Sequence, residues 1–252
     1  MHDITDIPLV IEVTPGLFVR RAEDVMTWVD MGPYGVVIDT LEKPETESEI
    51  LADIARTLGP KPIRYVLNTH THYDHVALNG VFERRGATII NRKVHPLDEQ
   101  GLTLCEGGRR LIMKPIPPCH TELDAIVHFP DDGVLIMGDV FGWGLIPLTT
   151  PLTRESAAML LDFYRQMIAL DPRVVVPGHG PMLERSHLER YVQYLPWLIE
   201  EVKSAMARGL DEEAIYAAVA PPADMHDWWR FLKWKHADSV KKVIHAAKRG
   251  RI

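Results

Sequence analysis

The sequence has 252 residues, of which 46% are hydrophobic and 25% are charged, and its formal net charge is −7. These proportions exclude a disordered chain, and a count of only two cysteines excludes a disulfide-rich secreted scaffold. The charge is uneven, because residues 226–252 carry eight basic and two acidic side chains, +6 in all, which leaves −13 on residues 1–225. A body this acidic disfavours general binding to nucleic acids.

The N-terminal residues contain no basic region followed by a long apolar run, so we expect no secretory signal. No run of about 18 apolar residues occurs, so we expect no membrane-spanning helix either. These two observations predict a cytoplasmic protein with reduced cysteines that does not act at a membrane.

The first part of the chain is expected to form short strands, because valine-rich segments alternate with Pro-Gly and Gly-Pro turns. The expected strands cover residues 10–13, 17–21, 25–31 and 36–39. An amphipathic helix is expected next, since Pro44 opens an acidic stretch and Gly59-Pro60 ends its apolar repeat. Further short strands are expected at residues 64–67, 87–91 and 110–113.

The second part begins with an expected hairpin, whose strands 125–129 and 134–137 flank a Pro-Asp-Asp-Gly turn. The remaining expected elements are a helix over 156–170, a strand over 174–176, and helices over 184–208, 211–219 and 227–249. Two runs of strands followed by helices predict an α/β fold with two sheets face to face and helices outside. We expect a catalytic domain over 1–208 and a C-terminal helical appendage over 209–252 that packs on the same domain.

Histidine is the unusual component of the sequence, since its 12 residues exceed the seven tyrosines and six phenylalanines. Directly after the strand expected at 64–67, four potential ligands fall within six residues: His70, His72, Asp74 and His75. Alternate side chains at a strand end point the same way, and the next helix can turn the other two toward the same hollow. This set suits a divalent metal such as zinc. The alternative interpretation is a polar loop without a metal.

The motif resembles that of the metallo-β-lactamase-fold superfamily of metallohydrolases, and the resemblance extends over about residues 8–185. Other family positions match His120 in Pro118-Cys119-His120-Thr121, Asp139 after Gly138, His179 in Gly178-His179-Gly180, and Asp39 in Ile38-Asp39-Thr40. The chain departs from the pattern at Leu123, where many relatives have a glycine. The resemblance implies a four-layer αββα sandwich of two mixed sheets with outer helices, followed here by the C-terminal helices.

The resemblance also implies a seven-ligand, dinuclear metal site. One ion would be held by His70, His72 and His120, and the second by Asp74, His75 and His179, with Asp139 bridging the two. Zinc is the expected metal, and iron or manganese also suits such mixed ligands. The implied reaction is attack by a bridging hydroxide on a small ester, thioester or lactone, with catalytic roles for Asp74 and Asp139.

Four further residues are candidates for supporting roles around the metals. Asp39 and Asp124 are expected to accept hydrogen bonds that orient ligand histidines, although Asp124 could instead be a solvated turn residue. Tyr73 and Trp143 are expected either to reach the substrate pocket or simply to pack in their loops.

Several members of the superfamily are disfavoured by single positions. Zinc β-lactamases generally have Cys or Ser where this chain has Asp139, and acyl-homoserine lactonases have a tyrosine where it has Gly142. The alternatives that stay open are a mononuclear iron sulfur dioxygenase and a phosphodiesterase or nuclease of the same fold. The expected partner is a small-molecule substrate rather than a nucleic acid. The apolar stripe over 227–249 is open to three interpretations: core packing, a substrate lid or a homodimer contact.

Overall fold

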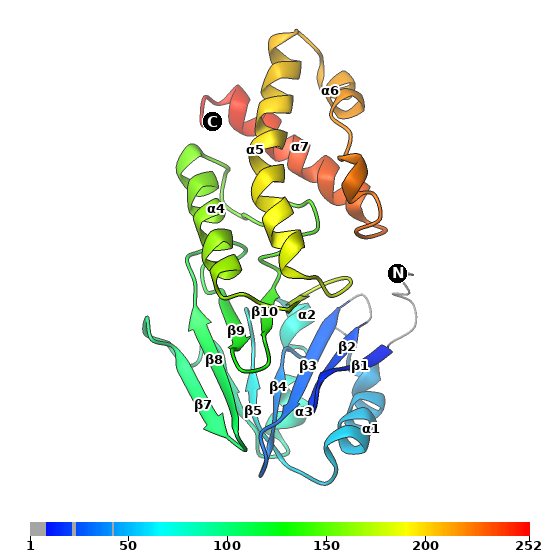
Figure 1. Cartoon of the computed structure of the whole chain (residues 1–252), viewed down its shortest axis with the longest axis vertical. Helices are drawn as coiled ribbons and strands as arrows, with labels where there is room; N and C mark the ends of the chain where they lie inside the picture. The colour runs from blue at the N-terminus through cyan, green and yellow to red at the C-terminus, as the bar shows by residue number, and fades with distance from the viewer. Residues whose placement is uncertain (1–8, 22–23, 42) are drawn as a thin grey trace.

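Two β-sheets lie face to face in the computed structural model, which describes residues 9–21, 24–41 and 43–252 (Figure 1). The first sheet has the strand order β1 (Leu9–Thr14), β2 (Leu17–Arg21), β3 (Val25–Asp30), β4 (Gly35–Ile38), β5 (Ile63–Leu67), β6 (Thr88–Ile90). The second sheet has the order β11 (Val174–Pro177), β10 (Val134–Gly138), β9 (Ala125–Phe129), β8 (Arg109–Pro115), β7 (Leu102–Glu106). Both sheets are mixed, because the pairs β4–β5, β5–β6 and β10–β11 are parallel whereas the other pairs are antiparallel.

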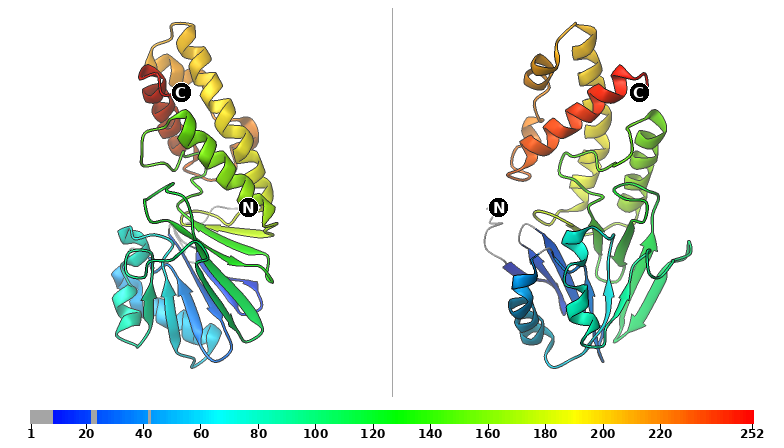
Figure 2. Two further views of the ribbon diagram at one scale, coloured as in Figure 1. Left: turned by 90° about the vertical axis from the view of Figure 1, so that its left-hand side faces the viewer. Right: turned by 180° about the vertical axis from the view of Figure 1, so that it is seen from behind.

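Helices cover the outer faces of both sheets (Figures 1 and 2). The helices on the first sheet are α1 (Glu47–Leu58) and α3 (Asn79–Glu83), and those on the second are α4 (Arg154–Ala169) and α5 (Arg185–Ala207). Short elements complete the chain: η1 (Pro44–Thr46), α2 (Tyr73–Val76), α6 (Glu212–Ala218) and η2 (Ala223–Met225). The last helix is α7 (Leu232–Lys248), which packs on α5.

Three apolar layers hold the four structural layers together, and strand β3 shows how the sequence produces them. Its alternate residues Val25 and Val29 face the second sheet, whereas Met26 and Trp28 face α1. The indole nitrogen of Trp28 donates a hydrogen bond of 2.8 Å to Thr57 Oγ1 on that helix. A strand buried on both faces needs such continuous hydrophobic character. The expected αββα arrangement of two mixed sheets is therefore confirmed.

Helix α7 buries one face within the chain. Its buried residues are Leu232, His236, Ser239, Val240, Val243, Ile244 and Ala246. The imidazole of His236 lies 2.8 Å from the Tyr194 hydroxyl of α5 and 2.7 Å from the Val219 carbonyl oxygen. Of the three interpretations of this apolar stripe, the structure has core packing.

Two expectations about elements are corrected. Strand β7 was absent from the expected elements, yet it forms an edge hairpin with β8 across Gly107 and Gly108. The helix expected over 227–249 begins only at Leu232, because the preceding segment is held in turns. Its indoles cause this, since both Trp228 and Trp229 pack against Trp143.

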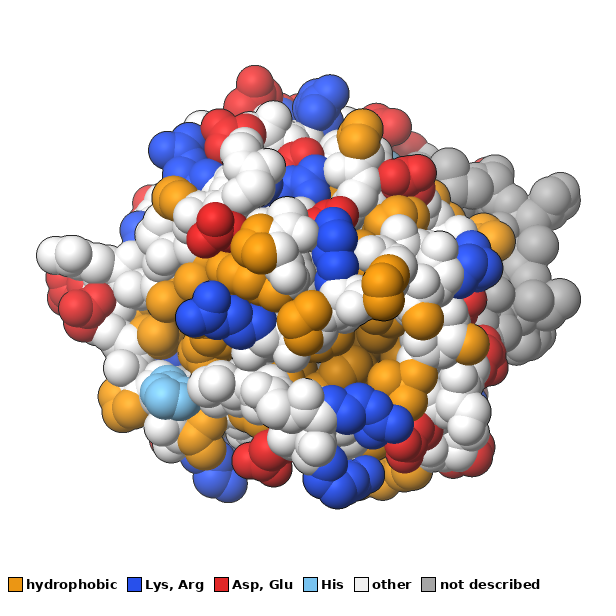
Figure 3. All heavy atoms as spheres, turned by 90° about the horizontal axis from the view of Figure 1, so that it is seen from below, with side chains coloured by type: hydrophobic (Ala, Val, Ile, Leu, Met, Phe, Trp, Pro, Cys, Tyr) orange, Lys and Arg blue, Asp and Glu red, His pale blue; other side chains and the backbone are white. Residues whose placement is uncertain are grey.

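The end of the molecule opposite α5–α7 has no single sign of charge. Basic and acidic side chains are interspersed there around hydrophobic ones (Figure 3). Within the described residues, no helix has the length and hydropathy needed to cross a membrane.

Candidate metal centre

Four loops from both sheets meet at one end of the sandwich. The loop after β5 leads into α2 and carries the histidine motif, while the loop after β8 carries His120. The parallel strands β10 and β11 end at the same edge and are followed by Asp139 and by His179. Loops beyond the carboxyl ends of neighbouring strands are the usual place for a ligand site in such sheets.

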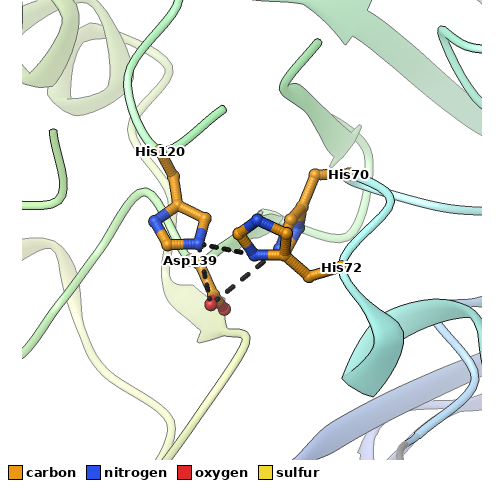
Figure 4. Close-up of side chains that lie close together, drawn as sticks. All are labelled: His70, His72, His120 and Asp139. Carbon is orange, nitrogen blue, oxygen red and sulfur yellow. Dashed lines mark hydrogen bonds and ion pairs between the residues drawn. The ribbon is translucent and has the colours of Figure 1, made fainter. Parts of the chain in front are cut away.

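The first of two groups of potential ligands consists of His70, His72, His120 and Asp139. Figure 4 shows these side chains pointing toward one another from separate loops. His120 Nε2 lies 3.0 Å from His72 Nδ1 and 3.4 Å from Asp139 Oδ2, and His70 Nε2 lies 3.9 Å from the same oxygen. One ligand atom from each of the four residues falls within 4.8 Å of the others.

The second group consists of Asp74, His75, His179 and, again, Asp139. His75 Nε2 lies 3.2 Å from Asp139 Oδ1 and 3.6 Å from Asp74 Oδ2. His179 Nε2 lies 3.1 Å from Asp74 Oδ2 and 3.3 Å from Asp139 Oδ2. Asp139 therefore belongs to both groups, and all seven residues expected to be ligands are brought together.

Most of the imidazoles have their other ring nitrogen engaged outside the cluster. His75 Nδ1 lies 3.0 Å from Asp39 Oδ2, and His179 Nδ1 lies 3.2 Å from Asp24 Oδ1. His120 Nδ1 lies 3.3 Å from the Pro147 carbonyl oxygen. These contacts direct Nε2 of each ring at the cluster, the arrangement usual for histidines that bind a metal.

Asp39 and Asp124 both act as acceptors, in different ways. Asp39 is buried and accepts hydrogen bonds of 2.8 Å from both the backbone N–H and the hydroxyl of Thr69, in addition to its contact with His75. Asp124 does not contact an imidazole. It accepts hydrogen bonds of 3.0, 2.7 and 2.8 Å from the backbone N–H groups of Cys119, His120 and Thr121, and so fixes the loop.

The two pocket candidates are placed differently. Tyr73 is 61% exposed, between two potential ligands in sequence, and its side chain faces solvent. Trp143 is buried, so it does not line an open pocket. Instead, its indole N–H donates a hydrogen bond of 3.0 Å to the backbone carbonyl of His179. Its contribution to the site is thus to hold the loop that carries His179.

Two supporting features were missed by the sequence analysis. Asp24 reaches His179 because the start of β3 pairs with the loop after β11, where Val25 N–H donates to the Gly178 carbonyl over 2.9 Å. Asn68 donates a hydrogen bond of 3.0 Å to the His75 carbonyl. Both contacts join segments that no local sequence motif connects, so no signal in a single sequence could have indicated them.

Burial and charge divide the two groups electrostatically. Burial lowers the pKa of His70 to about 2, assisted by the charge of His75, and burial also lowers the pKa of His120. Burial opposes protonation of His75 and His179 too, but Asp139 and other carboxylates outweigh it and raise these pKa values to about 10 and about 12. Burial acts to raise the pKa of Asp74, yet the hydrogen bond from His179 and the charge of His75 bring it down to about 2.

The residues fit a pair of divalent cations, because the cluster contains buried polar atoms that the protein does not satisfy. His70 Nε2, His75 Nε2 and Asp139 Oδ1 are buried and make no hydrogen bond. Such atoms are costly unless something binds them. Gly178 leaves them room, since a Cβ at this position would collide with Asp139 Oδ1 and lie 2.8 Å from His75 Cε1. Imidazole and carboxylate donors in this combination suit zinc, iron or manganese.

A family model described as the metallo-beta-lactamase superfamily matches residues 32–90 and 87–179. These ranges include all seven potential ligands and more than half of the chain, and the chain belongs to the metallo-beta-lactamase superfamily. The resemblance found in the sequence is therefore confirmed. A comparison with curated proteins finds no significant match.

Solved structures of the same fold include hydrolases of two kinds. A metallo-beta-lactamase from Pontibacter korlensis has a TM-score of 0.63 at 19% identity, and the match covers 75% of this chain and 98% of that chain. The metallo-beta-lactamase FIM-1 from Pseudomonas aeruginosa, in its mono-zinc form, has a TM-score of 0.59 at 18% identity, covering 74% and 94%. The sec-alkylsulfatase Pisa1 from Pseudomonas sp. has a TM-score of 0.69 at 16% identity, covering 95% of this chain and 50% of that chain. Superfamily members are metal-dependent hydrolases, in agreement with the expected class of enzyme.

Proposed function

We propose that the protein is a dinuclear metal-dependent hydrolase that cleaves a small ester, thioester or lactone by attack of an activated water. The observation that carries this proposal is the sharing of Asp139 between two groups of ligands, each with buried ring nitrogens that lack a hydrogen bond. A site for one cation would need only one such group.

The proposed roles follow from the two groups. His70, His72 and His120 would hold one cation, Asp74, His75 and His179 the other, and Asp139 both. Two divalent cations in such a site would lower the pKa of a shared water toward neutrality and polarise the bond to be cleaved. Zinc is the metal we propose, with iron and manganese as alternatives that metal analysis distinguishes.

The chain's own residues supply orientation and charge for this chemistry. Asp139 and Asp74 stay ionised, because both have lowered pKa values, and so provide two negative charges to the proposed cations. Asp39 and Asp24 hold the rings of His75 and His179 in place. A separate general base is not required if the shared water is the nucleophile.

Alkyl sulfates deserve a place among the candidate esters, on one specific observation. The match to the alkylsulfatase covers 95% of this chain, whereas the matches to the two β-lactamases cover 75% and 74%. Aspartate at position 139 also separates this chain from zinc β-lactamases, which generally have Cys or Ser there. We therefore place sulfate esters next to carboxylate esters and β-lactams last.

The test is a panel of lactones, thioesters, carboxylate esters, alkyl sulfates, phosphodiesters and β-lactams, assayed on protein with measured metal content. We expect two cations per chain and turnover of an ester-type substrate. His72→Ala and Asp139→Ala should each lose metal and activity together, whereas the exposed control His245→Ala should lose neither. One iron per chain with strict oxygen dependence would instead indicate a sulfur dioxygenase. Full turnover with two cations in Asp139→Ala would contradict the dinuclear assignment.

A further inference from the structure

A lysine in the first turn of α7 is enclosed by aromatic rings. The ammonium of Lys235 lies 4.6 Å from the ring centroid of Trp234 and 5.7 Å from that of Trp229. Trp234 is 64% exposed whereas Trp229 is only 5% exposed, so the ammonium sits between a solvent-facing ring and a buried one. An ammonium over aromatic faces is stabilised in a defined place rather than free to extend into water.

The buried ring connects this lysine to the candidate metal centre. Trp229 packs so closely on Gly180 that a Cβ there would lie 2.9 Å from its Cε2 atom. Gly180 directly follows His179, whose carbonyl accepts the hydrogen bond from Trp143. The chain between η2 and α7 consequently passes over the loop after β11 (Figures 1 and 2).

The charges of the centre reach the ammonium, yet none of them pairs with it. Burial lowers the pKa of Lys235, while Asp139, Asp238 and Asp74 act in the opposite direction and Lys242 assists burial. Among the residues that the structure describes, no carboxylate lies within 4.0 Å of this ammonium in an ion pair. Lys235 is thus a half-buried cation beside the cluster without a partner of its own in the described part of the chain.

We propose that Lys235 binds an anionic group of the substrate, so that the preferred substrates carry a carboxylate or sulfate near the bond that is cleaved. This inference rests on the proposed hydrolase function and names its substrate class. Once Asp74 and Asp139 are engaged by divalent cations, their charges no longer compensate the lysine. A buried cation is costly without an opposite charge, and an anionic substrate supplies one.

The kinetic test uses two thioesters of equal length, one ending in a carboxylate and the other in a methyl group. Lys235→Met keeps the length of the side chain and removes its charge, and Lys233→Met removes an exposed charge from the same helix as a control. We expect Lys235→Met to raise KM for the anionic thioester by about 10- to 100-fold, the range for a hydrogen bond to a charged group. KM for the neutral thioester and kcat for both should change little, and Lys235→Arg should restore part of the loss.

A binding measurement separates this inference from the proposed function. Succinate is titrated into metal-loaded protein and followed by tryptophan fluorescence, since two indoles flank the ammonium. We expect Lys235→Met to weaken succinate binding by about 10- to 100-fold, while Lys233→Met leaves it unchanged.

Equal succinate affinity in wild type and Lys235→Met would overturn the inference, whether or not any ester is hydrolysed. Equal kinetic losses for the charged and the neutral thioester would overturn it as well. If wild type hydrolyses neither thioester nor any ester of the panel while the difference in succinate binding persists, the proposed function fails but the anion site does not.

Discussion

At the scale of single residues, the orientation of the potential ligands depends on side chains that lie behind them. Asp39 accepts three hydrogen bonds, two from Thr69 and one from His75. Its backbone has a φ of +57°, in the left-handed region that aspartate tolerates better than most residues. The carboxylate is therefore fixed on both sides, and it fixes the ring of His75 before any cation arrives.

Asp39→Asn should weaken the binding of one cation by about 10- to 100-fold, the usual cost of removing a partner that orients a metal-binding histidine. An amide of the same shape cannot accept all three hydrogen bonds. The measurement is competition with a chromophoric chelator, with Asp53→Asn on the surface of α1 as the control. Equal affinities for both cations in Asp39→Asn and wild type would show that the ring of His75 is oriented by other contacts.

Gly178→Ala should abolish binding of the second cation with little loss of folding stability, because its Cβ would collide with Asp139 Oδ1 rather than with the core. Gly209→Ala is the matched control, since no atom lies within 4 Å of a Cβ at that position. Metal analysis and thermal unfolding of both variants check this expectation. Two tightly bound cations in Gly178→Ala would mean that Asp139 can adopt another position in the site.

How far the site could be predicted depends on how its residues are linked. His70, His72, Asp74 and His75 are neighbours in the chain, so their spacing alone indicates a shared function. Asp139, His120 and His179 lie on distant loops, and only resemblance to a known family connected them with the motif. Asp24 matched no pattern at all, because it meets His179 through pairing of two segments far apart in sequence.

At the scale of elements, the C-terminal helices support the loop that follows Asp139. Ser239 of α7 accepts a hydrogen bond of 2.8 Å from Ile146 N–H and donates one of 2.7 Å to the Gly144 carbonyl. Tyr194 of α5 donates to the same carbonyl over 2.9 Å. The loop that also carries Trp143 is therefore held by two helices outside the sandwich.

Ser239→Ala should lower the free energy of unfolding by about 1–3 kcal/mol, because it leaves the buried Ile146 N–H without an acceptor. Ser204→Ala, at an exposed position of α5, should change this free energy by less than about 0.5 kcal/mol. Denaturant unfolding of both variants gives the comparison. Similar stabilities would indicate that water reaches the loop and replaces the serine hydroxyl.

The elements that were mispredicted are those whose structure depends on distant partners. Residues 227–231 have an apolar repeat typical of a helix, but Trp228 and Trp229 pack on Trp143, and this packing holds the segment in turns. Strand β7 is an edge strand paired on one side only, and its short alternating pattern lies between glycines. The hairpin β9–β10, by contrast, carries its turn within its own sequence and was predicted.

At the scale of the whole molecule, the candidate centre joins the two sheets. His70 and its neighbours follow β5 of the first sheet, whereas Asp139 and His179 follow strands of the second. The backbone contact between Val25 and Gly178 closes the same edge. Cations bound there would cross-link both halves of the sandwich, so their binding should stabilise the entire fold by mass action.

The two cations should respond differently to pH, because the two groups of ligands hold different numbers of protons without metal. His70 and His120 have lowered pKa values and offer neutral nitrogens at pH 7. His75 and His179 have pKa values raised to about 10 and about 12, so they are protonated there. Since a metal binds only the deprotonated ring, binding to the second group must release protons.

Affinity for the second cation should therefore fall as the pH is lowered from about 8 to about 6, by up to about tenfold per pH unit for each proton displaced. The sign follows from the raised pKa values, since acid favours the protonated rings that compete with the metal. Calorimetric titration in buffers of different ionisation enthalpy counts the protons released by each equivalent. The equivalent that binds first should release fewer protons than the second, and His179→Ala should remove the second, proton-coupled step. Equal proton release for both equivalents would mean that the two groups are not electrostatically distinct.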